Sequence, residues 1–284
     1  MRLYDATPCT LGEGPLWHPE REQLFWFDII GRRLYSRDGG TTRHWQFAEH
    51  VSAAGWIDRD HLLIASERAL FRFALETGAR LDLAALEADK PGNRSNDGRA
   101  DPQGGFWIGT MDKAAAAGEG AIYRFYRGEL RRLFGPLSIP NAISFAPDGR
   151  TACFGDTAIG KVWRVTLDAE GWPAGAPELY LDLAPDGLNP DGAVFDAAGR
   201  FWVAQWGAGR VAAYAPAGDF LRAVAVPAPH SSCPAFGGPG LATLFCTTAR
   251  QGLGAAGLAA APQSGMTFAG DAATSGQAEH RVLL

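Results

Sequence analysis

The chain has 284 residues, 46% of them hydrophobic and 20% charged, so it can bury a large core. Its net charge of −5 provides no basic surface for nucleic acid, and no apolar run is long enough to span a bilayer. The 36 glycines and 18 prolines predict many turns, as a fold of short β-strands requires.

The cysteines and the first residues bear on the compartment. The four cysteines have no CxxC spacing and are too few to cross-link a chain of this length, so we expect buried free thiols. Residues 1–5 begin no apolar signal-peptide core. We therefore expect a cytoplasmic protein with no membrane partner.

One unit recurs six times along the chain: an apolar strand, a tight turn rich in Gly, Asp or Pro, and a second apolar strand. The first strands of these units end at residues 17, 56, 100, 145, 195 and 236. A repeat of roughly 40–50 residues is typical of one propeller blade. We therefore predict an all-β protein, a six-bladed β-propeller with four antiparallel strands per blade, formed by a single domain over residues 1–284.

The two ends of the chain are both strand-like, at residues 2–4 and 280–284. We expect them to pair within one blade and close the ring, because closure removes exposed sheet edges. Residues 81–88 have the one plausible helical pattern, although this stretch could equally be a loop. Residues 114–120 and 254–265 are expected to be flexible loops.

A polar residue stands four positions before the end of each first strand, and the six are Glu13, Ser52, Asn96, Asn141, Asp191 and Ser232. Innermost strands lie along the channel of a propeller, so these residues should form a ring around its axis. Carboxylates brought together repel unless a cation or proton is shared, and oxygen donors suit Ca²⁺, Mg²⁺ or Mn²⁺. The pattern predicts a divalent cation on the axis. Alternatively, each residue taken singly could be a turn residue that satisfies local backbone groups.

Several segments in the right order resemble the gluconolactonase family, whose members include regucalcin (senescence marker protein), luciferin-regenerating enzyme and bacterial sugar-acid lactonases. The segments are Leu-Gly-Glu-Gly-Pro-Leu-Trp (11–17), Arg-Ser-Asn-Asp-Gly (94–98), Gly-Thr-Met-Asp (109–112), Pro-Asn-Ala-Ile-Ser-Phe (140–145), Pro-Asp-Gly (190–192) and Cys-Pro-Ala-Phe-Gly-Gly (233–238). The resemblance implies a six-bladed propeller with one divalent metal ion, first Ca²⁺, with Zn²⁺, Mn²⁺, Mg²⁺ or Fe²⁺ as alternatives.

The same resemblance implies roles for five residues. Glu13, Asn141 and Asp191 would bind the metal, and Arg94 and Asn96 would bind the substrate. The implied reaction is hydrolysis of a small sugar lactone, such as a glucono-, galactono- or xylonolactone, to the free acid. The metal would polarise the carbonyl group, and Asp191 would be the general base. A hydroxide on the metal is the alternative base. The sugar, its ring size and the oligomeric state stay open.

Two other functions remain open. An aryl-ester or phosphotriester hydrolase is favoured if the mouth is apolar and Arg94 does not point inward. A non-catalytic calcium-binding propeller is favoured if the channel is obstructed. Trp26 and Trp206 could stack on a sugar, although such tryptophans are usually core residues. The loop at 113–120 is expected to cover the mouth, and it departs from the regucalcin pattern, so regucalcin's substrate preference does not transfer.

Overall fold

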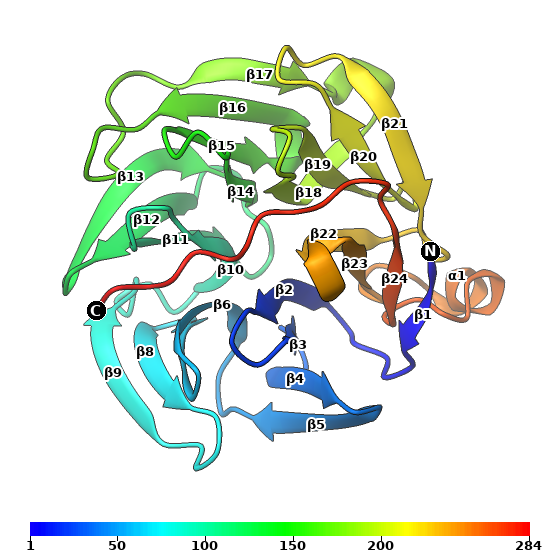
Figure 1. Ribbon diagram of the computed structural model, residues 1–284, viewed down its shortest axis with the longest axis horizontal. Coiled ribbons are helices and arrows are strands. Elements are labelled where there is room, and N and C mark those ends of the chain that lie inside the picture. The colour runs from blue at the N-terminus through cyan, green and yellow to red at the C-terminus, as the bar shows by residue number, and fades with distance from the viewer.

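A computed structural model describes residues 1–284 and contains six four-stranded antiparallel sheets around a central axis (Figure 1). The predicted six-bladed β-propeller is therefore confirmed. The strand nearest the axis is buried in each blade, and these inner strands are β2 (Gly12–His18), β6 (Val51–Asp58), β10 (Asn93–Ala100), β14 (Pro140–Phe145), β18 (Asn189–Phe195) and β22 (Ser231–Gly237).

The remaining strands of the first five blades follow outward in chain order, and the outermost strands are the most exposed. They are β3 (Gln23–Asp28), β4 (Arg33–Asp38), β5 (Thr41–Gln46), β7 (His61–Ser66), β8 (Ala69–Ala74), β9 (Arg80–Ala85), β11 (Phe106–Asp112), β12 (Gly120–Tyr126), β13 (Glu129–Leu137), β15 (Thr151–Asp156), β16 (Lys161–Thr166), β17 (Glu178–Asp182), β19 (Phe201–Trp206), β20 (Arg210–Tyr214) and β21 (Phe220–Ala225).

The sixth blade joins the two ends of the chain. It consists of β22, β23 (Thr243–Thr248), β24 (Thr267–Asp271) and the N-terminal strand β1 (Arg2–Asp5). The ring is thus closed by a strand from each end, as predicted. The partner of β1 is β24, however, and the expectation that residues 280–284 pair with it is wrong. The reason is that Phe268 of β24 fills the apolar interface between the fifth and sixth blades.

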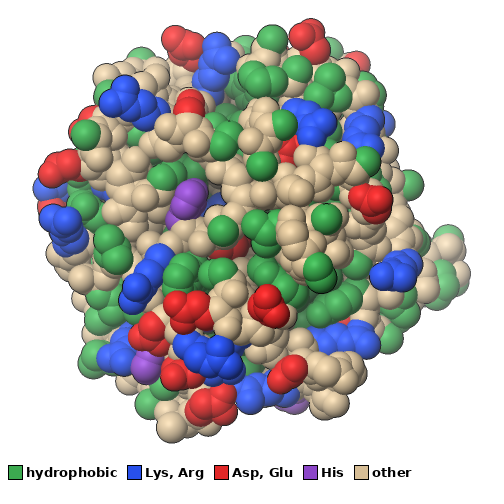
Figure 2. Space-filling model, in the orientation of Figure 1, with side chains coloured by type: hydrophobic (Ala, Val, Ile, Leu, Met, Phe, Trp, Pro, Cys, Tyr) green, Lys and Arg blue, Asp and Glu red, His purple; other side chains and the backbone are tan.

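Residues 272–284, the C-terminal strap, instead cross one face of the propeller (Figure 1). Within the strap, the backbone N–H of Val282 donates to the carbonyl of Trp56 at 2.9 Å, and the Gln277 amide donates to the carbonyl of Phe145 at 3.1 Å. Trp56 and Phe145 lie near the C-terminal ends of their inner strands. The strap therefore covers the channel at that end, where side chains cover the centre of the face in Figure 2.

The helices differ from the predictions. Residues 80–85 form the edge strand β9, which pairs with β8, so the helical pattern at 81–88 is wrong. The single α-helix, α1 (Ala255–Ala260), lies in a stretch that was expected to be a loop. It is helical because four of its six residues are alanine, which favours helix. Three 3₁₀ turns complete the list: η1 (Thr157–Ile159), η2 (Ala184–Asp186) and η3 (Pro239–Leu241). No helix is long and apolar enough to cross a membrane.

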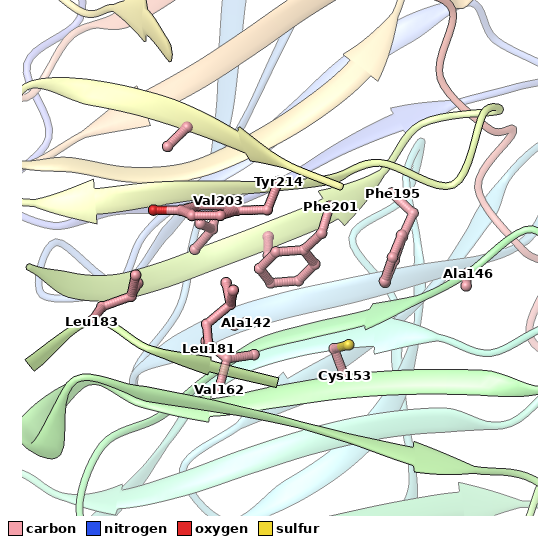
Figure 3. Packing of buried hydrophobic residues seen from close by; sticks show 12 residues of the cluster. Ala142, Ala146, Cys153, Val162, Leu181, Leu183, Phe195, Phe201, Val203 and Tyr214 are labelled. Carbon is pink, nitrogen blue, oxygen red and sulfur yellow. The ribbon is translucent and has the colours of Figure 1, made fainter. Parts of the chain in front are cut away.

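Apolar side chains between neighbouring blades form the core. Figure 3 shows one such interface, where Val162 and Leu181 of the fourth blade face Phe201 and Tyr214 of the fifth. Burying this apolar surface fixes the angle between blades, and therefore the positions of the inner strands. All four cysteines are free and buried, as predicted.

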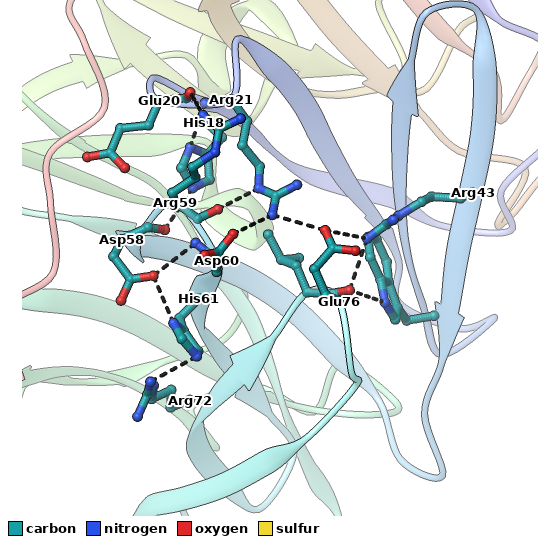
Figure 4. A network of polar contacts seen from close by, with 12 residues as sticks. His18, Glu20, Arg21, Arg43, Asp58, Arg59, Asp60, His61, Arg72 and Glu76 are labelled. Carbon is teal, nitrogen blue, oxygen red and sulfur yellow. Dashed lines mark hydrogen bonds and ion pairs between the residues drawn. The ribbon is translucent and has the colours of Figure 1, made fainter.

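Charged side chains connect the first two blades at the surface (Figure 4). Arg21 donates to Asp60 at 2.8 Å and to Glu76 at 3.1 Å, and both acidic side chains are exposed. Exposed ion pairs contribute little to stability. The apolar interfaces, rather than this network, therefore hold the blades together.

Removing buried volume from the strap should destabilise the whole ring. Val282 is 1% exposed, and its side chain packs against Gly55 of the second blade. We expect Val282→Ala to lower the free energy of unfolding by about 2 kcal/mol in chemical denaturation, since two buried carbons are lost and a cavity remains. Leu284→Ala, at a side chain that is 48% exposed, is the control and should change it by less than about 0.5 kcal/mol. Equal effects would contradict the packing role of the strap.

Candidate functional site

Each inner strand contains a β-bulge near its beginning. The pairing with the second strand shifts register between Glu13 and Leu16 in the first blade and between Asn141 and Ser144 in the fourth, and the other four blades shift at similar places. A bulge breaks the strict alternation of side chains and changes the direction in which a residue points. The bulges therefore explain why polar residues on apolar strands can turn toward the axis.

The backbone at two bulges has left-handed dihedral angles. Gly14 has φ +52°, and a Cβ there would lie 2.4 Å from the carbonyl oxygen of Ser52. Ala142 has φ +58°, which is uncommon for a residue with a side chain. The carboxylate of Asp97 accepts the next N–H, that of Ile143, at 2.8 Å. Asp97 therefore supports the bulge of the neighbouring blade and does not line the cavity described next.

A cavity of about 480 Å³ lies on the axis at the end of the channel opposite the strap. Its wall includes all five residues to which the sequence analysis gave a role: Glu13, Arg94, Asn96, Asn141 and Asp191. All five are at least 94% buried. They come from four different inner strands, so the propeller brings together residues up to 178 positions apart, Glu13 and Asp191 being the extremes.

The two serines of the predicted ring have other partners. Ser52 donates to the hydroxyl of Ser95 at 2.8 Å, and Ser232 donates to the carbonyl of Gly12 at 2.5 Å. Neither lines the cavity. The prediction of a six-membered polar ring is therefore wrong at these two positions, where the hydroxyls tie neighbouring blades together.

A chain of four hydrogen bonds crosses the wall of the cavity, and we call it the polar chain. Arg94 donates through Nη1 to Oδ1 of Asn96 at 2.8 Å, and Asn96 donates through Nδ2 to Oδ1 of Asn141 at 2.9 Å. Asn141 donates through Nδ2 to the hydroxyl of Thr157 at 2.7 Å. The Thr157 hydroxyl donates to the carbonyl of Pro190 at 2.6 Å. The polar chain therefore joins the third, fourth and fifth blades.

The charges in the cavity wall are not balanced. Burial, followed by repulsion from Asp97, raises the pKa of Glu13 to about 8. Burial, followed by repulsion from Glu13, raises the pKa of Asp191 well above its usual range. Burial lowers the pKa of Arg94 only to about 10, so its guanidinium stays charged at neutral pH. If both carboxyl groups were ionised, two buried negative charges would face the single positive charge of Arg94, and the raised pKa values express the free-energy cost of that state.

The donor set fits a hard divalent cation. No group of three or more His, Cys, Asp or Glu side chains is arranged to hold a metal, so an ion here would need an amide oxygen beside the two carboxylates. Asn141 supplies that oxygen in the same cavity wall. A cation would also offset the burial and the repulsion that raise both carboxyl pKa values. Oxygen donors of this kind suit Ca²⁺, Mg²⁺ or Mn²⁺.

Several residues of the wall were not found from the sequence, and Thr157 is the most important of them. It follows β15, in which Gly155 pairs with Asn141, so the hairpin register could have pointed to this position. Lys113 and the two alanines after it line the cavity, in agreement with a loop at the mouth. Trp206 also lines it, whereas Trp26 is fully buried in the core.

A larger cleft of about 980 Å³ lies between the fourth and fifth blades. Its charged residues include Asp148, Arg164 and Glu178. Glu178 accepts a hydrogen bond from Arg164 at 3.5 Å. Asp148 accepts the backbone N–H groups of its own turn. Buried charges do not converge there, so the axial cavity is the better candidate for chemistry.

Comparison with known proteins gives a consistent set of relatives. The protein-family model described as the SMP-30/gluconolactonase/LRE-like region matches residues 11–250 of this chain. A predicted sugar lactone lactonase of Rhizobium meliloti is 42% identical over 94% of this chain and 92% of its own. L-arabinolactonase of Azospirillum brasilense is 35% identical over 98% and 94%. The crystal structure of a calcium-binding protein, regucalcin, from Agrobacterium tumefaciens superposes with TM-score 0.97 at 40% identity, over 100% and 97% of the two chains.

The unbalanced charges should destabilise the metal-free protein in a pH-dependent way. Because the pKa of Glu13 is raised in the folded state, its contribution to stability is present below the unfolded pKa and is lost as pH rises through about 8. We expect Glu13→Gln to raise the free energy of unfolding in chelator by an amount that grows from pH 5 to pH 8, on the order of 2 kcal/mol at the upper end.

Urea denaturation at several pH values measures this difference. Glu119→Gln, at an exposed carboxylate of the mouth loop, is the control and should show no such trend. A Glu13→Gln variant less stable than the wild type at pH 8 in chelator would contradict the charge imbalance.

Proposed function

The chain belongs to the SMP-30/gluconolactonase/LRE-like family, and from this membership and the axial site we propose that it hydrolyses a sugar-acid lactone to the free acid. The observation that carries the proposal is the convergence of Glu13, Asn141, Asp191, Arg94 and Asn96 on one cavity. Relatives named as lactonases, including L-arabinolactonase, support the substrate class.

We assign substrate orientation to Arg94 and Asn96. Nη1 of Arg94 donates to Asn96 and to the carbonyl of Ser95, whereas its Nε and Nη2 make no hydrogen bond within the protein. These free donors belong to a fixed planar fork, which suits the neighbouring hydroxyls of a sugar lactone. An aldonolactone such as a glucono-, galactono- or xylonolactone fits this polar inner wall.

We assign the metal-binding role to Glu13, Asn141 and Asp191. A bound divalent cation supplies Lewis acidity toward the lactone carbonyl. Ca²⁺ is our first choice, because the Agrobacterium tumefaciens regucalcin is described as calcium-binding. Zn²⁺, Mn²⁺, Mg²⁺ and Fe²⁺ are the alternatives to be compared in the assay.

Asp191 is our candidate general base. A general base must be ionised, and the buried Asp191 carboxyl has a raised pKa when no cation lies beside it. Its ionised form therefore depends on positive charge in the cavity. In that form Asp191 would accept a proton from the water that attacks the lactone carbonyl.

The alternatives are less well supported. An aryl-ester or phosphotriester hydrolase is expected to have no arginine pointing into its active-site cavity, but Arg94 lines this cavity. A non-catalytic propeller predicts an obstructed channel. The strap covers one end of the channel, but the cavity of about 480 Å³ at the other end has room for a monosaccharide. The lactone hydrolase is therefore the function that we carry forward.

The first test is a panel of aldonolactones and aryl esters, read by proton release. We expect lactone hydrolysis that is abolished by a chelator and restored by a divalent cation, with little turnover of aryl esters. Adding each candidate cation to the chelated protein identifies the metal that restores most activity. Full activity in chelator would rule out the metal-dependent reaction.

The second test separates the base from the ligand. Asp191→Asn keeps an oxygen donor but cannot accept the proton, so kcat should fall by about 10²–10⁴-fold. Calorimetric titration with Ca²⁺ on the same sample checks whether metal binding survives. Metal binding with low kcat supports the base role, whereas wild-type kcat would exclude it.

A further inference from the structure

The polar chain can run in only one direction. Its first member, Arg94, carries only hydrogen-bond donors, and its last, the carbonyl of Pro190, is only an acceptor. Every group between them must therefore accept from the Arg94 side and donate toward the Pro190 side. This polarity fixes the orientation of both side-chain amides, which geometry alone leaves two-fold ambiguous.

Thr157 is the member that fixes Asn141. A hydroxyl has one proton, and that of Thr157 is donated to the carbonyl of Pro190, so only its lone pairs face the Asn141 amide. Turning this amide over would place Oδ1 against those lone pairs. It would also place the amide NH₂ of Asn141 against the NH₂ of Asn96. Both contacts would be repulsive.

The position of Thr157 is itself well determined. It begins η1, and Asp156 before it accepts the N–H groups of Ser138 at 2.8 Å, Ile139 at 3.0 Å and Ala158 at 3.1 Å. The N–H of Thr157 donates to the carbonyl of Ile139 at 3.0 Å. The hydroxyl is therefore presented from a fixed backbone.

We infer that Thr157 is a positioning residue for the metal site: its hydroxyl holds the Asn141 amide so that Oδ1 accepts from Asn96 with one lone pair and keeps the other for a divalent cation. The same hydroxyl binds the carbonyl of Pro190, the residue before Asp191, so it joins two of the three proposed ligands. Thr157 touches neither cation nor reacting atoms in this role. The inference rests on the proposed metal-binding role of Asn141 and extends it to a residue outside the ligand set.

The test replaces Thr157 with Val, which has a similar volume but offers no acceptor to Asn141. Ca²⁺ alone is titrated into the chelator-treated, desalted full chain by calorimetry, with Mn²⁺ and Zn²⁺ in parallel. We expect the dissociation constant to rise about 10–100-fold, the usual effect of losing a residue that orients a ligand. Thr157→Ser, which keeps the hydroxyl, should restore an affinity within about three-fold of the wild type.

Thr248→Val is the matched control. Thr248 is fully buried, its hydroxyl donates to the carbonyl of Met266 at the same 2.6 Å, and this hydroxyl makes no hydrogen bond to a proposed ligand. Its Ca²⁺ affinity should equal that of the wild type. Thr157→Ala serves as a second variant without an acceptor if the Val variant has a lowered unfolding temperature in chelator.

The outcomes separate the inference from the proposed function. Wild-type affinity in the Val and Ala variants, or no binding of any of the three ions by the wild type, would overturn the inference. Lactone hydrolysis is measured on the same samples. A wild type that binds the ion but hydrolyses no lactone would overturn the proposed function, and the affinity series would still decide the role of Thr157.

Discussion

Glu13 and Asp191 are buried together at one end of the propeller axis, and this burial of like charge is the constraint on which the site depends. Both carboxylates have lost water, both have raised pKa values, and Arg94 is the cation that faces them. Such an arrangement is stable only if the surrounding structure enforces it. The apolar interfaces between blades supply that enforcement, because they fix the inner strands that carry these residues.

The fold was predictable from the sequence because its signals are local. Apolar strands, turn residues and a repeat of roughly 40–50 residues are all visible along one chain, and they gave the six blades. Ring closure was predicted, but its partner was not, because the choice between β24 and residues 280–284 depends on which segment fills the last core. The helix α1 was missed because its surroundings are rich in glycine.

The site was predictable only in part. The register of the repeat brought Glu13, Asn96, Asn141 and Asp191 together, because equivalent positions in the blades share a height on the axis. That register could not distinguish Ser52 and Ser232, since the partner of a hydroxyl depends on the neighbouring blade. Thr157 was missed because it lies just beyond the second strand of its hairpin and outside the repeat register, although its partner Asn141 is in the same blade and Pro190 in the next.

The C-terminal strap also determines how small molecules enter and leave the axial cavity. The pocket between Gln277 of the strap and the ends of several inner strands has a volume of about 30 Å³, room for only a few water molecules. The channel is therefore closed at the end under the strap. Its opening lies at the other end, beside Trp206 and the loop at 113–120. A small molecule that enters the cavity must leave through the same opening. Substrate entry and product release therefore occur on the same face of the propeller.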